Sequence, residues 1–338
     1  MLVVVCPGQG AQSPGMLRPW LDVPGAQAWL DYARVATGVD LVRHGTESDA
    51  ETIRDTAVAQ PLLVASALMS LRALLDDFDV SDSSGPAAGP WPATGVDVVA
   101  GHSVGELAAA AVSGLLDETD ALRLVAVRGR AMADAAAAAA PTGMSAVLGG
   151  DPDAVLARLA ELGLTAANVN GGGQVVAAGA LDRLAELAAA PPARARVMPL
   201  QVAGAFHTEV MAPAVTALAD AAAQTVPHDP GPVLLGNADG ARVTTAADGL
   251  ARLVAQVARP VRWDLCSQTM ADLGVTGLLE LAPGGVLTGL ARRTLPDVER
   301  VALKSPDDLD DALDLLVRHA GTAQRGHAHG EVPEQEQL

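Results

Sequence analysis

The sequence contains few aromatic residues and almost no lysine. Phe, Trp and Tyr together make up 2% of the 338 residues, and Lys304 is the only lysine. Because 50% of the chain is nevertheless apolar by residue type, the hydrophobic core has to be built mainly from Ala, Val and Leu. That apolar content excludes a largely disordered chain, and the length suits two domains or one large domain with an insertion.

Positive charge is also scarce. The chain has 22 Lys and Arg residues against 40 Asp and Glu residues, which gives a formal net charge of −18. A protein that binds nucleic acid through a broad face needs many basic side chains to neutralise phosphates. The composition therefore excludes nucleic-acid binding of that kind.

Cysteines are also few, and long apolar runs are lacking. Cys6 and Cys266 cannot by themselves form a disulfide framework or a metal site, so we expect two reduced, buried thiols. The apolar run at residues 2–6 is too short for a signal peptide and lacks a basic segment before it, which favours a buried strand. Apart from weakly hydrophobic Ala-rich stretches, no run of about 18 uncharged apolar residues appears. We therefore expect a cytoplasmic protein without a membrane span.

Short apolar runs alternate with stretches of helical spacing in the first third of the chain. Residues 3–6 and 96–100 are typical of buried strands, whereas residues 60–75 and 106–116 have helical spacing. Residues 80–95 are rich in Gly, Pro and Ser and are predicted to be a surface excursion. This alternation predicts an α/β fold whose parallel sheet is covered on both faces.

The middle of the chain has a different order of elements. Helices are expected after Asp151 and at residues 181–190, and strands at residues 144–148, 166–170, 174–178 and 195–200. The order strand, helix, strand, strand, helix, strand is that of a ferredoxin-like unit. We therefore predict a small ferredoxin-like subdomain inserted into a larger α/β one.

The predicted boundaries follow from this order. A large subdomain, α/β-hydrolase-like, is assigned to residues 1–131 and 199–318, and the inserted small subdomain to residues 132–198. Residues 319–338 are expected to be a disordered tail. His327 and His329 in that tail could bind a metal weakly, but a solvated tail is the better interpretation of them.

The segment Gly101-His102-Ser103-Val104-Gly105 is a G-x-S-x-G motif. It follows an apolar run and precedes a helix, as a nucleophile elbow requires. Glycines allow the strand and the helix to approach closely around a strained turn, which exposes the Ser103 hydroxyl above the sheet. The alternative is a purely structural turn between a strand and a helix.

A serine hydroxyl needs a base before it can act as a nucleophile. Seven histidines are available, and His102 adjoins the serine, so its side chain should point away from the Ser103 hydroxyl. His207 follows the small subdomain and can return to the serine at the cleft between the subdomains. It is the candidate base, with a histidine that serves only the core or a helix cap as the alternative.

Five motifs occur in an order that resembles a known family. They are Pro7-Gly8-Gln9-Gly10-Ala11-Gln12, Gly101-His102-Ser103-Val104-Gly105-Glu106, Arg128-Gly129-Arg130-Ala131-Met132, Gly204-Ala205-Phe206-His207 and Pro283-Gly284-Gly285-Val286-Leu287-Thr288-Gly289-Leu290. Together they resemble the malonyl-CoA:acyl carrier protein transacylases of fatty acid synthesis, most closely the discrete actinobacterial type. The resemblance extends from residue 1 to about residue 318.

The resemblance implies how the serine would be activated. Ser103 would attack the malonyl thioester, and His207 would accept its proton and later return one to the departing thiolate. The backbone carbonyl of Gln256 would orient the histidine in place of a carboxylate. The N–H groups of Gln9 and Val104 would form the oxyanion hole. Without the resemblance, Gln256 would be interpreted as an exposed helix residue and Gln9 as part of a turn that ends a strand.

The resemblance also implies how the substrate would be selected. Arg128 would bind the malonyl carboxylate through two parallel hydrogen bonds and disfavour acetyl, which lacks that charge. Phe206 would fill the space of an α-methyl group, and Met132 would line the acyl pocket. Asn168 and Asn170 would face the pantetheine arm. The ordinary alternatives are a surface arginine, a core methionine and turn-forming asparagines.

The function implied is transfer of malonyl from malonyl-CoA to the phosphopantetheine thiol of an acyl carrier protein through a malonyl-serine intermediate. No resident cofactor or metal is expected, since malonyl-CoA is a substrate and phosphopantetheine belongs to the carrier. The product would supply fatty acid synthesis, and a polyketide pathway stays open. A serine esterase or thioesterase and a non-catalytic binding module are the rival hypotheses.

An acidic carrier would be repelled by the net negative charge of this chain, so docking would need a local basic patch. Candidates for that patch are Arg259, Arg262, Arg292 and Arg293. A solvated surface role is the equal alternative for them.

Overall fold

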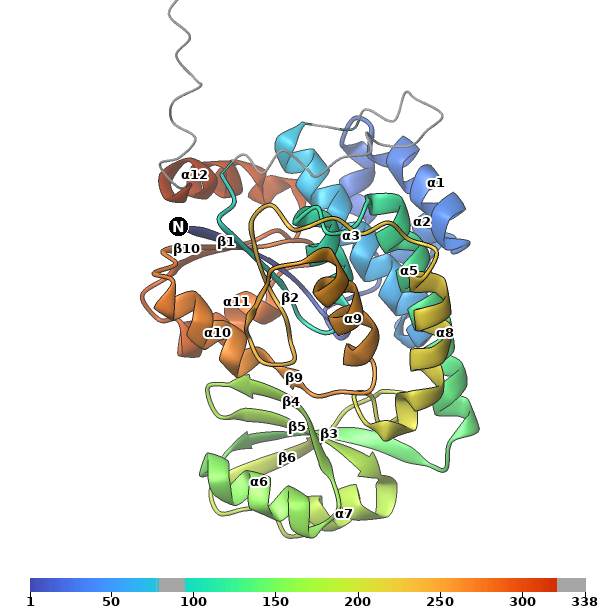
Figure 1. Cartoon of the computed structure of the whole chain (residues 1–338), viewed down its shortest axis with the longest axis vertical. Helices are drawn as coiled ribbons and strands as arrows, with labels where there is room; N and C mark the ends of the chain where they lie inside the picture. The colour runs from blue at the N-terminus through green and yellow to red at the C-terminus, as the bar shows by residue number, and fades with distance from the viewer. Residues whose placement is uncertain (77, 79–94, 321–338) are drawn as a thin grey trace, which may run out of the picture.

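A computed structural model describes residues 1–76, 78 and 95–320 of the chain. Within them the protein is an α/β fold with two sheets, of which the larger lies above the smaller in Figure 1. Residues 80–94 of the predicted surface excursion and residues 321–338 of the predicted tail lie outside the described residues. His319, where the predicted tail begins, is the last residue of helix α12 (Leu309–His319).

The larger sheet has the strand order β11-β10-β1-β2-β7-β8. Its strands are β1 (Leu2–Cys6), β2 (Val98–Gly101), β7 (Val233–Leu235), β8 (Arg242–Val243), β10 (Gly277–Glu280) and β11 (Glu299–Ala302). The first five strands in the spatial order are parallel, as predicted, whereas β8 is antiparallel to β7 and makes the sheet mixed.

Both faces of this sheet are covered, which confirms the prediction from the alternation of strands and helices. Val3 and Val5 pack into one cluster with side chains of α10 (Trp263–Asp272) and α11 (Val286–Thr294). Leu2, Val4 and Cys6 pack into a second cluster on the other face. We call the larger sheet and its helices the larger lobe, and the smaller sheet and its helices the smaller lobe. The remaining helices of the larger lobe are α1 (Ala26–Thr37), α2 (Leu41–Thr46), α3 (Thr56–Leu75), α4 (Gly105–Val112), α5 (Glu118–Ala138), α8 (Ala212–Ala222) and α9 (Ala246–Gln256).

Helix α3 is the one described helix whose length and composition would allow it to cross a membrane. Of its most apolar window, 83% is buried inside the protein. The helix packs against α4 and α5, so its apolar surface is used by the core.

The smaller sheet has the strand order β6-β3-β5-β4-β9. Its strands are β3 (Thr142–Gly149), β4 (Thr165–Gly171), β5 (Gln174–Ala180), β6 (Ala195–Pro199) and β9 (Val261–Arg262). Strands β4 and β5 form the predicted hairpin, and α6 (Pro152–Glu161) begins after Asp151, whose side chain accepts a hydrogen bond from the N–H of Ala154. Helix α7 (Leu181–Ala189) completes the predicted order of elements.

The two faces of the smaller sheet have different partners. Helices α6 and α7 cover the face away from the larger sheet (Figure 1) and share a separate apolar cluster with it. On the other face, Met144 and Val176 join the main core. Two features connect this sheet to the rest of the chain: helix α5 is continuous across the predicted boundary at residues 131 and 132, and β9 pairs with β4 from outside residues 132–198.

A buried carboxylate fixes the start of helix α11. Glu280, at the end of β10, is fully buried and accepts hydrogen bonds from four backbone N–H groups at distances of 2.8 to 3.1 Å. The donors belong to Gly285, Val286, Leu287 and Thr288. These are the groups that a helix start leaves without internal partners, so Glu280 acts as its cap.

We expect Glu280→Gln to lower the free energy of unfolding by roughly 2 to 4 kcal/mol. Each carboxylate oxygen accepts two N–H groups, so an amide nitrogen at either position leaves two buried donors without an acceptor. Urea unfolding measures the loss. Glu161→Gln, on the exposed end of α6, is the matched control and should have a much smaller effect; equal losses in the two variants would contradict the capping role.

Candidate active site

Ser103 lies in a strained turn between β2 and α4. Its φ of 55° is in the left-handed region, which a serine adopts only when its surroundings enforce it. A Cβ atom at Gly105 would lie 2.2 Å from the carbonyl oxygen of Cys6, so only glycine allows the helix to approach β1 this closely. The glycine requirement predicted for the elbow is confirmed.

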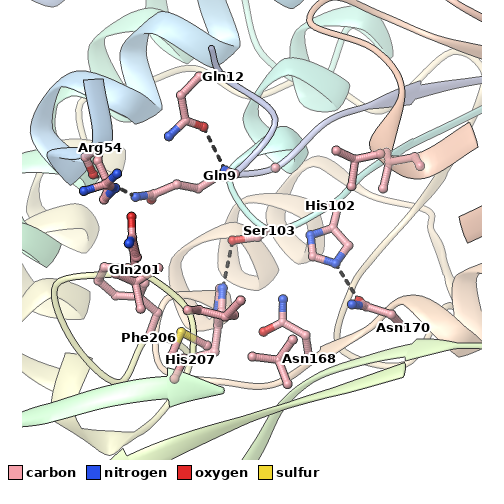
Figure 2. A pocket seen from close by; sticks show the side chains of 18 of the residues that line it. Gln9, Gln12, Arg54, His102, Ser103, Asn168, Asn170, Gln201, Phe206 and His207 are labelled. Carbon is pink, nitrogen blue, oxygen red and sulfur yellow. Dashed lines mark hydrogen bonds between the residues drawn. The ribbon is translucent and has the colours of Figure 1, made fainter. Parts of the chain in front are cut away.

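Ser103 and His207 point toward one another across the pocket (Figure 2). The Oγ of Ser103 lies 2.8 Å from Nε2 of His207, although the residues are 104 positions apart in the chain. The other ring nitrogen, Nδ1, lies 3.2 Å from the backbone carbonyl oxygen of Gln256. When Nδ1–H donates to that carbonyl, Nε2 is free to accept the serine proton.

His102 turns away from the serine hydroxyl, as its adjacent position predicts (Figure 2). Its Nε2 lies 2.9 Å from the side-chain oxygen of Asn170 on β4, and its ring packs edge-on against Trp263. His102 therefore connects the elbow to the smaller sheet.

Two backbone N–H groups next to the serine have no hydrogen-bond partners among the described residues. They belong to Gln9, in the loop after β1, and to Val104, which follows the serine. The Gln9 side chain turns away toward the carbonyl oxygen of Arg54 (Figure 2). At Gly8 a Cβ atom would lie 2.7 Å from the His102 carbonyl oxygen, so the loop touches the elbow at this point.

Arg128 lies beneath the serine and is 2% exposed. Its Nη1 donates to the side-chain oxygen of Gln60 at 2.7 Å and its Nη2 to that of Gln256 at 3.0 Å. Nη2 also lies 3.5 Å from the Ser103 Oγ. Burial lowers the pKa of the guanidinium to about 10, so the group stays charged at neutral pH. No carboxylate among the described residues forms an ion pair with it.

The base is held in its neutral form. Burial, followed by the positive charge of Arg128, lowers the pKa of His207 to about 3. A neutral imidazole with its Nε2 on the serine hydroxyl is ready to accept a proton at physiological pH.

A cavity of about 650 Å³ opens in front of the serine. Phe206 and Met132 line it and are almost fully buried, and Met144 and Val176 of the smaller sheet add apolar surface. Asn168 and Asn170 line it as well; the buried side-chain oxygen of Asn168 has no partner among the described residues. Arg128 and Gln256 lie behind this lining rather than in it.

Residues 3–306 match the family of the acyl transferase domain. The chain belongs to this family. Over 316 residues it is 49% identical to the malonyl CoA-acyl carrier protein transacylase of Mycobacterium tuberculosis, a match that covers 93% of this chain and all of the relative.

Solved structures agree with the sequence match. The crystal structure of MCAT from Mycobacterium tuberculosis superposes with a TM-score of 0.85 at 48% identity, covering 93% of this chain and 99% of the other. A type II PKS acyl-carrier protein in complex with its malonyl-transacylase is a further match, with a TM-score of 0.81 at 28% identity and coverage of 93% and 99%.

Two residues of the acyl transferase site were not predicted from the sequence. Gln60 holds Arg128, and the side-chain oxygen of Asn237 accepts the Ser103 N–H at 2.7 Å. Each carried a signal that could have been used. Gln60 is an amide at the start of a very apolar helix, and Asn237 follows a strand at the end of the sheet where parallel α/β folds bind ligands.

The four candidate docking arginines differ in their surroundings. Arg292 and Arg293 are exposed in the last turn of α11, and Arg293 also lines the cavity and donates to the side chain of Gln174. Arg259 is exposed, whereas Arg262 is paired with Asp264 at 2.8 Å. Because Asp264 partly neutralises its charge, Arg262 would attract an acidic partner less strongly.

The two cysteines of the acyl transferase are buried and unpaired, as predicted. Burial raises the pKa of both thiols, which makes them poor nucleophiles. The described residues contain no group of three or more His, Cys, Asp or Glu side chains that could hold a metal ion.

We expect the rate of Ser103 acylation to change little between about pH 7.5 and about pH 5. A histidine with the ordinary pKa of about 6.5 would become protonated in this range, whereas His207 stays neutral until the pH approaches its pKa of about 3. Because the unfolded chain binds this proton below about pH 6.5 and the folded chain only near pH 3, His207 makes the fold less stable as pH falls from about 6.5 to about 3. Single-turnover acylation at each pH measures the first effect.

The matched variant for this experiment is Arg128→Ala. It removes the charge that helps to lower the pKa of His207, so the acidic decline in acylation should move to higher pH. A decline near pH 6.5 in both proteins would contradict the neutral-histidine interpretation.

Proposed function

We propose that the protein transfers malonyl from malonyl-CoA to the phosphopantetheine thiol of an acyl carrier protein. The observation that carries this proposal is the buried guanidinium of Arg128, which forms no ion pair with a carboxylate among the described residues and lies 3.5 Å from the Ser103 hydroxyl. A malonyl group bound to that oxygen would carry its carboxylate to the guanidinium. An uncharged acyl group would leave the buried cation without an anion.

The first half-reaction acylates the serine. Nε2 of His207 takes the proton of the Ser103 hydroxyl while Oγ forms a bond to the thioester carbon. When the tetrahedral intermediate collapses, the carbon–sulfur bond breaks and His207 returns the proton to the thiolate, so that free coenzyme A leaves.

The second half-reaction reverses these roles. The phosphopantetheine thiol of the carrier gives its proton to His207, and its sulfur attacks the ester carbon of malonyl-Ser103. The bond from that carbon to Oγ breaks, and His207 protonates the serine oxygen. The enzyme therefore returns to its initial state after each transfer.

The negative charge of each tetrahedral intermediate needs donors that are already in place. The backbone N–H groups of Gln9 and Val104 are the proposed oxyanion hole, supported by their lack of other partners among the described residues. Neither N–H requires a side-chain movement before it can donate.

A serine esterase or thioesterase of the α/β-hydrolase type is the less well supported alternative. Such an enzyme places a carboxylate against the histidine. In the part of the chain that the structure describes, Nδ1 of His207 lies 3.2 Å from the carbonyl oxygen of Gln256 and 3.1 Å from its side-chain nitrogen, and no carboxylate contacts the ring. A neutral carbonyl orients the imidazole without stabilising its protonated form as strongly as a carboxylate would.

Substrate selection is assigned to the lining of the cavity. Phe206 is proposed to occupy the space of an α-methyl group and Met132 to contact the acyl chain. The unpartnered oxygen of Asn168 suits an amide N–H of the pantetheine arm. The Asn170 oxygen is already used by His102, so Asn170 is proposed to contact the arm through its remaining polar atoms.

The proposed partners are malonyl-CoA and an acyl carrier protein, in line with the names of the transacylase relatives. Arg293 is the best placed of the candidate docking residues, because it is exposed and at the cavity. Fatty acid synthesis is the proposed use of the product, and polyketide synthesis uses the same chemistry. The reaction as written involves no electron transfer or Lewis acid, so no resident cofactor is proposed. The proposed location is the cytoplasm.

The proposed division of the chain keeps a large α/β-hydrolase-like part, residues 1–131 and 199–318, and a small ferredoxin-like part, residues 132–198. It is supported by the strand order β6-β3-β5-β4 and by the two helices on one face of that sheet. The continuity of α5 and the pairing of β9 with β4 make the two parts one packed body.

Incubation with malonyl-CoA alone should release one equivalent of coenzyme A per enzyme in a burst and leave malonyl on Ser103. Peptide mass spectrometry locates the adduct, and carrier protein should then remove it. Ser103→Ala is expected to lose both the burst and the transfer, which would also exclude a non-catalytic binding module. Steady hydrolysis of malonyl-CoA at the same rate with and without carrier would favour the thioesterase instead.

We expect Arg128→Ala to lose two to three orders of magnitude in kcat/KM for malonyl-CoA, roughly the cost of removing one partner of a buried charge pair. Transfer of acetyl should be retained or improved, because the variant no longer buries an unpaired cation. Competition between malonyl-, methylmalonyl- and acetyl-CoA measures the preference. Arg130→Ala, an exposed arginine on the same helix, is the control and should keep the wild-type order. A wild-type enzyme without preference would refute the role of Arg128.

A further inference from the structure

The geometry points to Asn237 as a positioning residue that holds the nucleophilic serine in its reactive conformation. The inference rests on the proposed function, in which Ser103 carries the acyl group. Asn237 lies just beyond β7 and has no exposed surface. Because β7 pairs in parallel with β2, the end of β7 lies beside the elbow.

The side chain of Asn237 spans the elbow on its protein side. Its oxygen accepts the Ser103 N–H at 2.7 Å, and its nitrogen donates to the carbonyl oxygen of Gly101 at 2.7 Å. One carboxamide thus joins the peptide groups on both sides of His102. A carboxylate has no donor and a methyl group has neither function, so only an amide satisfies both contacts.

The backbone of Asn237 is also held by two hydrogen bonds. Its N–H donates to the side chain of Glu106 at 2.7 Å, and its carbonyl oxygen accepts the N–H of Arg262 at 2.8 Å. Glu106 lies in the first turn of the helix that follows the serine, and Arg262 belongs to β9 of the smaller sheet. The residue that holds Ser103 is therefore anchored to both lobes of the molecule.

Glu106 holds the backbone of Asn237 through only one of its two side-chain oxygens. The oxygen that accepts the Asn237 N–H is engaged, whereas the other is buried without a partner among the described residues. Burial raises the pKa of Glu106 to about 8, and the engaged oxygen can accept a hydrogen bond in either protonation state.

The serine conformation explains why such support is needed. A φ of 55° is unfavourable for serine, and the N–H of Ser103 would be left without an acceptor if the elbow had only its own backbone. The turn sets the direction of Oγ toward His207, and displacement of a reacting atom by about 1 Å can cost roughly 100-fold in rate. Asn237 is not among the residues that line the cavity, and it contacts the lining residue Ser103 through the backbone N–H, so its effect passes through Ser103.

The test compares Asn237→Ala with Ser70→Ala in the full-length chain. Ser70 is also fully buried, and its hydroxyl accepts the N–H of Ala282, so its loss removes a comparable buried hydrogen bond away from the elbow. Phenylmethanesulfonyl fluoride, a small uncharged reagent, probes the serine without needing the malonyl or coenzyme A sites. Melting temperature, the Kd for coenzyme A and the rate of Ser103 sulfonylation are measured for each variant.

We expect Asn237→Ala to sulfonylate Ser103 roughly 10- to 100-fold more slowly than wild type, with a corresponding fall in kcat and little change in the Kd for coenzyme A. Ser70→Ala should lose similar thermal stability while keeping the sulfonylation rate. Wild-type sulfonylation in Asn237→Ala, or an equal fall in both variants, would overturn the inference.

Two further variants decide the case if Asn237→Ala does not fold. Glu106→Gln keeps an oxygen for the Asn237 N–H and should retain more of the sulfonylation rate than Glu106→Ala, which removes it. Equal rates in these two variants would overturn the role of the anchored asparagine. Failure of wild type to form malonyl-Ser103 would instead refute the proposed function, since sulfonylation does not depend on malonyl-CoA.

Discussion

The site depends on a positive charge that is buried without an ion-pair partner among the described residues. Arg128 is held by the neutral side chains of Gln60 and Gln256, which come from α3 and α9. These neutral acceptors keep the guanidinium in place without forming an ion pair with it, and burial together with that charge lowers the pKa of His207. The same group can therefore attract a carboxylate and keep the neighbouring base neutral. The Ser103 Oγ lies 3.5 Å from Nη2 of this guanidinium, so both effects act at the nucleophile.

The architecture explains how this charge can be buried. The parallel strands β1, β2 and β7 of the larger sheet end on the same side, in the elbow and in the loops that follow β1 and β7. Ser103, Gln9 and Asn237 therefore meet there although they are distant in the chain. Helices α3, α5 and α9 bring the amides and the guanidinium to the same edge. The smaller sheet closes the site from the other side, where Asn170 contacts His102 and Met144 and Val176 line the cavity. The cavity therefore lies between the two sheets, and Arg128 lies behind its lining.

Much of the fold and part of the site could be predicted from local patterns. Apolar runs of strand length, a Gly-rich turn around Ser103 and the N-cap at Asp151 are local signals, and the structure has strands and helices at these places. The antiparallel strand β8, with two residues, and β9, which joins the smaller sheet from a distant part of the chain, have no such signal. Gln60 and Asn237 were missed because their roles depend on partners in other elements, and a single sequence does not reveal those pairings.

The sequence by itself determined the alternation of strands and helices, the elbow and the set of motifs that resembles the transacylase family, because each depends on residue types within a few positions of one another. Only the tertiary structure decided that the Nε2 of His207 reaches Ser103, that the carbonyl oxygen of Gln256 faces its other nitrogen, and that Arg128 is buried rather than at the surface. The physical reason is that burial and hydrogen bonding are properties of neighbours in space. A guanidinium has the same sequence context in solvent and in a core, and its charge acquires a specific effect only where the fold removes water and forms no ion pair with it.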